Sequence, residues 1–77
     1  MPSEKTLFAM DINTLLAVEQ LAKEKGKSPE SVLLDFMESN TAKMAYDDAT
    51  KLWWDGPAST AECYKEEVEK IISSQQN

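Results

Sequence analysis

The sequence contains no histidine, no arginine and a single cysteine among its 77 residues. Histidine is the commonest general base and metal ligand, so its absence removes most catalytic triads and most zinc sites. The lone Cys63 excludes an internal disulfide and a cysteine-rich metal site, and it suits a reducing compartment. We therefore expect a cytoplasmic protein that is not an enzyme and holds neither a metal nor a cofactor.

The sequence also lacks a long apolar run. No stretch approaches the 18 apolar residues that a membrane-spanning helix needs, and the N-terminal MPSEKTLFAM has no basic region typical of a signal peptide. We expect no membrane segment. A chain of this length forms one domain, which we predict to span residues 1–77, with possible flexibility in residues 1–10 and a frayed tail at 74–77.

The net charge is −6, and it is spread evenly over the chain. Residues 1–40 and residues 41–77 each carry four lysines against seven acidic residues. Nucleic-acid binding requires a basic face, and arginine supplies the commonest base contact. The charge therefore argues against a nucleic-acid partner. It fits a solvated acidic surface, or an acidic surface that meets a basic partner.

Helical periodicity predicts a hairpin of two helices, at about 13–25 and 29–39. Gly26 is a typical helix stop, and Ser28 followed by Pro29 is a typical start. We place the beginning of the first helix near residues 11–13, because an unbroken helix would put Asp11 on its apolar stripe, where a buried carboxylate is costly.

Two more helices are expected, a short one at 41–46 and a closing one at about 59–73. Ser59 and Glu62 match a capping box at the start of the last helix. The predicted fold class is thus all-α, a small three- to four-helix bundle with an irregular Trp-bearing connector before the last helix. Its predicted core consists of Leu15, Val18, Leu21, Leu33, Phe36, Met44, Leu52, Tyr64, Val68 and Ile71, with Cys63 as a small packed side chain.

The connector carries the best candidate binding residues, the adjacent Trp53 and Trp54. Two neighbouring indoles do not easily enter one small core, so either one plugs the core and the other covers a helix end, or one is an exposed anchor. Tryptophan is enriched at binding hot spots. We predict a partner-binding site at Tyr46, Trp53, Trp54 and Asp55. Asp55 with the nearby acidic pair at 47–48 does not have the spacing of a calcium loop.

The segment KTLFAM at 5–10, followed by a helical hairpin, resembles the strand and first helices of ribbon-helix-helix repressors. That resemblance covers residues 5–36 and implies an obligate dimer whose strand pair enters the major groove of DNA. Leu7 and Ala9 would face the groove, however, and neither makes the bidentate contacts that read bases. A DNA-binding repressor is the alternative function.

A second resemblance spans about residues 15–72 and rests on VEQLAKEKG (18–26), SPESVLLDF (28–36), MAYDD (44–48) and LWWDG (52–56). These segments resemble a bacterial family of small helical proteins with a Leu-His-Thr-Gln-Gly motif, whose members tend to be encoded near toxin-like proteins. Trp53 stands where the family has histidine, and Leu21 stands where it has tyrosine. The resemblance implies an antitoxin-like or adaptor role.

Taken together, the sequence predicts a non-enzymatic protein-binding module, with a toxin-like protein as the partner that the resemblance implies. Its mechanism would be occlusion, in which an acidic and aromatic surface covers a site on the partner. A further alternative is a self-associating structural module, because small domains often gain stability as homodimers.

Overall fold

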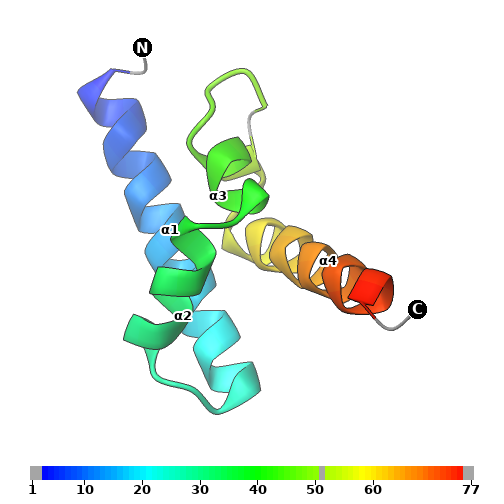
Figure 1. Ribbon diagram of the computed structural model, residues 1–77. Coiled ribbons are helices and arrows are strands. Elements are labelled where there is room, and N and C mark those ends of the chain that lie inside the picture. The colour runs from blue at the N-terminus through cyan, green and yellow to red at the C-terminus, as the bar shows by residue number, and fades with distance from the viewer. Residues whose placement is uncertain (1–2, 51, 76–77) are drawn as a thin grey trace.

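The chain is helical in the part that the structure describes, residues 3–50 and 52–75 of a computed structural model (Figure 1). The elements in chain order are α1 (Glu4–Lys25), α2 (Pro29–Met37), α3 (Asn40–Ala45), the 3₁₀ helix η1 (Leu52–Asp55) and α4 (Pro57–Gln75). No strand occurs among these residues. The all-α fold predicted from the sequence is confirmed, with η1 in place of the irregular connector.

Serine caps begin α1, α2 and α3. The hydroxyl oxygens of Ser3, Ser28 and Ser39 accept hydrogen bonds from the backbone N–H groups of Thr6, Ser31 and Ala42, at 3.2, 3.3 and 3.1 Å. Each bond satisfies one of the backbone donors that a helix leaves unpaired in its first turn. The predicted cap at Ser28 and the predicted stop at Gly26, which has a left-handed φ of 65°, are both confirmed.

The start of α1 was predicted wrongly. The helix begins at Glu4 rather than near residues 11–13, and it passes through Asp11 without a break. Asp11 lies on an exposed side of the helix, so its carboxylate is not buried and there is no penalty to avoid. Residues 5–10 are therefore helical, and the strand that the ribbon-helix-helix alternative requires is absent.

The start of α4 also differs from the prediction. It begins at Pro57 rather than Ser59, so the expected capping box lies inside the helix. The fixed φ of proline suits a first helical turn, and the Thr60 N–H already donates to the Gly56 carbonyl at 3.2 Å. The helix continues to Gln75, past the predicted end at 73. Residues 1–2 and 76–77, which belong to the segments predicted to be flexible or frayed, lie outside the described residues.

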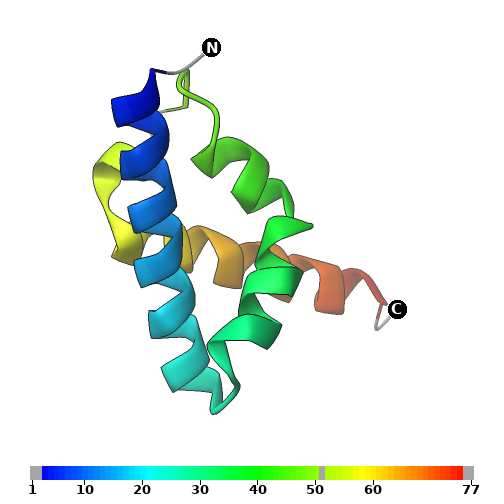
Figure 2. The same cartoon turned by 90° about the vertical axis from the view of Figure 1, so that its left-hand side faces the viewer.

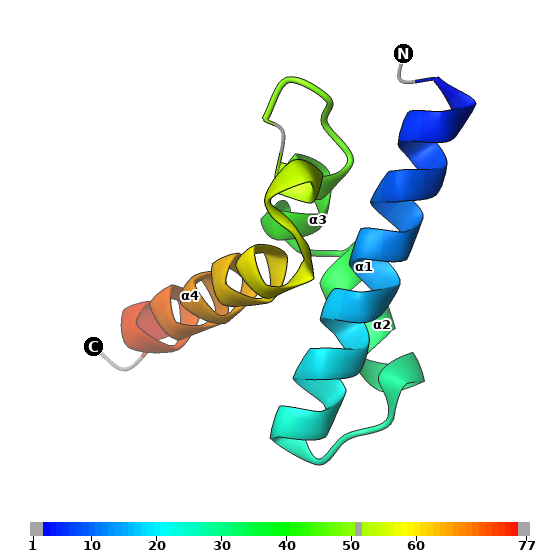
Figure 3. The same cartoon turned by 180° about the vertical axis from the view of Figure 1, so that it is seen from behind.

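Helix α1 forms the axis of the fold. Helix α2 returns beside it, and α4 lies crosswise behind it, with its C-terminal end projecting beyond the other helices (Figures 1 and 2). Seen from behind, η1 leads directly into α4 (Figure 3). A buried hydrogen bond of 2.8 Å, from the Asn13 amide to the Thr60 hydroxyl, joins α1 to α4.

The core lies where these helices meet. Val18, Leu21, Phe36, Leu52 and Tyr64 are buried there, as predicted, and Leu33, Cys63 and Val68 are half-buried against them. The rings of Phe36 and Tyr64 pack with centroids 5.5 Å apart. Met10 and several alanines complete the core.

Three residues predicted to be core are exposed: Leu15 by 53%, Met44 by 40% and Ile71 by 49%. Leu15 is one residue away from the buried stripe of α1. Helix α3 turns the small Ala42 and Ala45 inward instead of Met44. Ile71 lies in the C-terminal part of α4, beyond Val68, the last residue of that helix packed against the core.

Candidate interaction surfaces

The tryptophan pair lies on η1, which packs against α1, α3 and α4. Trp53 is half-buried, and its indole N–H is buried without a hydrogen-bond partner among the described residues, so packing alone holds it. Trp54 is 69% exposed, and the two indole centroids are 5.6 Å apart. Asp55 is exposed beside it. This arrangement presents one large aromatic side chain on a short, braced helix.

Tyr46, the fourth predicted residue, is half-buried at the end of α3. Its hydroxyl donates a hydrogen bond of 2.6 Å to Asp11 Oδ1 on α1. Burial raises the pKa of Tyr46, and the hydrogen bond to the negatively charged Asp11 raises it further, whereas the nearby Thr14 hydroxyl lowers it. The Tyr46 hydroxyl therefore stays protonated at neutral pH, and its hydrogen bond to Asp11 joins α3 to α1.

A hollow of about 350 Å³ opens beside the hydrogen bond between Tyr46 and Asp11. Its lining is mainly apolar and comes from three helices: Asp11, Thr14, Leu15, Leu33, Met37 and Tyr46. Leu15 and Met37 are each about half exposed, at 53% and 50%. The hollow thus combines an apolar lining with the carboxylate of Asp11.

The structure thus divides the four predicted residues between two places. Trp53, Trp54 and Asp55 lie together on η1, whereas Tyr46 lies at the hollow. Helix α3 and η1 pack against each other, but the lining of the hollow includes none of the three η1 residues. Asp11 and Tyr46 are 35 positions apart in the chain, so no local pattern in the sequence predicts their contact.

A third exposed surface runs along α1. Phe8, Ile12 and Leu16 are 67%, 42% and 47% exposed, and they follow one another at intervals of four residues. That interval places them in one row on the helix. We call this row the outer stripe. The spacing of four residues is visible in the sequence, but it alone does not show that this face of the helix is uncovered.

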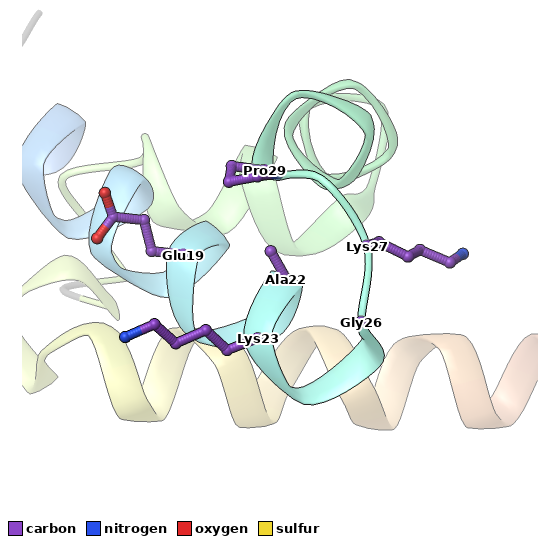
Figure 4. Close-up of a pocket in the computed structure, with 6 residues that line it drawn as sticks. All are labelled: Glu19, Ala22, Lys23, Gly26, Lys27 and Pro29. Atoms are coloured by element: carbon purple, nitrogen blue, oxygen red, sulfur yellow. The ribbon is translucent and has the colours of Figure 1, made fainter.

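A wider hollow of about 540 Å³ lies at the hairpin between α1 and α2 (Figure 4). Ala22, Gly26 and Pro29 line it together with three charged residues, of which Glu19 and Lys23 extend to one side and Lys27 to the other (Figure 4). A binding site for a small molecule usually brings a few polar groups together. This hollow does not, so it gives no indication of a ligand.

One ion pair among the described residues joins α1 to α4. The Lys65 ammonium bridges Glu24 and Glu62 at 2.8 and 3.2 Å. In the described part of the chain, no three His, Cys, Asp or Glu side chains gather in a way that could hold a metal ion. None of the described helices is long and apolar enough to cross a membrane.

Comparison with known proteins adds no relative. No family model, curated protein or solved structure matches the chain. The surfaces described above are therefore the basis for a functional proposal.

Proposed function

We propose that this protein is a non-enzymatic binding module that recognises another protein through the exposed face of η1. The observation that carries the proposal is the exposure of Trp54 on a well-packed helical turn. Its side chain is 69% exposed, yet it stands on a helical turn that is packed against three helices and braced by Trp53. Burial of such an aromatic anchor gives a large gain at little cost in conformational entropy.

The charge of the surface indicates the character of the partner. Asp55 is exposed next to Trp54, and the whole chain carries a net charge of −6. A partner with a basic rim around an apolar pocket would complement both features. The resemblance found in the sequence implies a toxin-like protein, which the module would neutralise by covering a basic site.

Capture of a partner from lysate of the source cell tests the proposal, with Trp54→Ala beside the native protein. Leu34→Ala is a matched control, because Leu34 is a similarly exposed apolar residue, at 71%, on α2. We expect the native protein and Leu34→Ala to capture the same protein and Trp54→Ala to lose it. Loss of a hot-spot tryptophan typically weakens binding by about 2 kcal/mol or more, roughly thirtyfold.

Circular dichroism of the variants separates binding from folding. Trp54→Ala should keep the helical signal and melting temperature of the native protein, because most of the side chain is already in solvent. Equal capture by Trp54→Ala and the native protein would contradict the proposed surface. Loss of capture together with unfolding would show that Trp54 is structural.

A further inference from the structure

Helix α1 is apolar on two faces. One face is buried in the core and consists of Met10, Ala17, Val18, Leu21 and Ala22 with the polar Asn13 and Thr14. The other face is the outer stripe, which no described element covers, since its three side chains are 42–67% exposed. Contiguous exposed apolar surface usually marks an interface.

Opposite charges flank the outer stripe. Lys5 precedes Phe8 by three residues, and Glu19 follows Leu16 by three, so both stand on the same side of the helix as the stripe. Both are exposed, and neither forms a hydrogen bond or an ion pair with any residue that the structure describes. The stripe therefore begins with an unpaired positive charge and ends with an unpaired negative one.

We propose that a second copy of this chain covers the outer stripe, with the two α1 helices antiparallel. In such a pair a two-fold axis passes beside Ile12, so that Ile12 meets its own copy. Phe8 then packs against Leu16 of the second copy. Lys5 meets Glu19 of the second copy, and symmetry makes that contact twice.

The charges select the antiparallel arrangement. A parallel pair in register would set each Lys5 beside the other Lys5 and each Glu19 beside the other Glu19, and like charges in contact oppose association. The antiparallel pair matches opposite charges at both ends of the stripe.

The exposed area sets the strength of the dimer. Side chains of about 200 Å² that are roughly half exposed give an apolar stripe on the order of 300 Å² per copy. The stripe alone would bury on the order of 600 Å² in the dimer, less than the roughly 1,200 Å² at the lower end of stable specific complexes. We therefore expect a weak dimer, with a dissociation constant on the order of 100 μM, so that the monomer predominates in dilute solution.

Sedimentation equilibrium of the purified full chain, from about ten-fold below to about ten-fold above 100 μM, measures this constant directly. Ile12→Glu sets two carboxylates against each other at the axis and should raise the dissociation constant at least about a hundredfold. Leu34→Glu adds the same charge outside the outer stripe and should leave it within about two-fold. A native chain that stays monomeric over this range, or a dimer that survives Ile12→Glu, overturns the proposal.

A charge exchange tests the orientation. Lys5→Glu alone, or Glu19→Lys alone, places like charges together at both ends and should weaken the dimer about five- to ten-fold in low salt. The double variant restores the opposite pairing and should return the constant to near the native value. Failure of the double variant to recover would exclude the antiparallel register.

This inference stands apart from the proposed partner-binding function. Trp54→Ala should leave the dimer unchanged, because η1 carries no residue of the outer stripe, and the measurement requires no other protein. Each variant is checked by circular dichroism, and Leu34→Glu shows whether an added charge on an exposed helix face is tolerated by the fold.

Discussion

The Tyr46 hydroxyl donates a hydrogen bond of 2.6 Å to the Asp11 carboxylate, and the two residues are 35 positions apart in the chain. The contact fixes the end of α3 against α1 and closes one side of the apolar hollow. Because its donor and acceptor come from different helices, its contribution can be measured by removing either group.

Tyr46→Phe deletes the hydroxyl and keeps the ring. We expect a loss of about 1 kcal/mol in the free energy of unfolding, since the bond has a charged acceptor but lies partly in solvent. Urea denaturation measures the change. In an Asp11→Ala background the same substitution should have little effect, and an undiminished loss there would mean that the hydroxyl acts through another contact.

Alkaline pH should weaken the fold through the tyrosines. Burial raises the pKa of both Tyr46 and Tyr64 above the ordinary value of 10.0, and nearby carboxylates raise it further. The folded state therefore retains protons that the unfolded state loses. The stabilisation is complete below pH 10 and is lost as the pH rises through the elevated values.

Urea denaturation between about pH 8 and pH 11 follows this loss. Tyr46→Phe should reduce the decline without abolishing it, because Tyr64 remains. Lys65 should add to this loss of stability at alkaline pH, because hydrogen bonds to Glu24 and Glu62 raise the pKa of its ammonium group. A native protein equally stable across this range would contradict the assignment.

Glu67 on α4 caps the start of α3. Its carboxylate accepts hydrogen bonds from the backbone N–H groups of Asn40 and Thr41, at 3.0 and 2.8 Å, and from the Thr41 hydroxyl at 2.7 Å. Glu67→Gln should cost about 1 kcal/mol, because the amide keeps only one accepting oxygen and no charge. Chemical denaturation checks this, with the exposed neighbour Glu66→Gln as the control.

The pH dependence of the Glu67 cap follows from its pKa. Partial burial works to raise that pKa, but the hydrogen bonds from Thr41 and Asn40 together with the charge of Lys43 lower it below 4.5. The stabilisation is therefore present above pH 4.5 and disappears as the pH falls through the lowered value. The native protein and Glu67→Gln should converge in stability at acid pH, and a gap that persists there would exclude a charge effect.

Phe36 should be the most sensitive position of the core. Its side chain is fully buried, and its ring packs against Tyr64 with centroids 5.5 Å apart. Phe36→Ala leaves a cavity and should cost about 3–5 kcal/mol, enough to unfold much of a domain this small. Leu34→Ala, two residues earlier and 71% exposed, should change stability by less than about 0.5 kcal/mol. Thermal melts of the two variants distinguish these outcomes.

The sequence predicts the features of this fold that depend on near neighbours. Ser28, Pro29 and Gly26 mark the hairpin correctly because caps and stops act within a few residues. The periodic apolar residues Val18, Leu21 and Phe36 are buried for the same reason, since helical spacing sets which side chains share a face.

The features that the sequence did not predict depend on how the helices meet. The first helix was predicted to begin near residues 11–13 because Asp11 was expected on its buried face, whereas the packing of α1 leaves Asp11 exposed. Ile71 follows the apolar spacing of α4 as well as Tyr64 does, yet that helix packs against the core only as far as Val68, and its residues 69–72 are exposed. Periodicity identifies a face, whereas the crossing of two helices decides how much of that face is covered.

The four candidate binding residues remain a prediction, and the sequence predicts only part of their arrangement. Trp53, Trp54 and Asp55 lie together on η1 because they are adjacent in the chain. Tyr46 instead lines the hollow with residues of α1 and α2, and no local sequence pattern predicts that packing.

The serine caps of α1, α2 and α3 have a consequence for how the protein forms. Each helix start is stabilised by a contact only three residues long, which closes quickly and at little cost in chain entropy. The bond from Asn13 to Thr60, by contrast, spans 47 residues. We therefore expect the three capped helices to form early and the arrival of α4 on α1 to limit the folding rate.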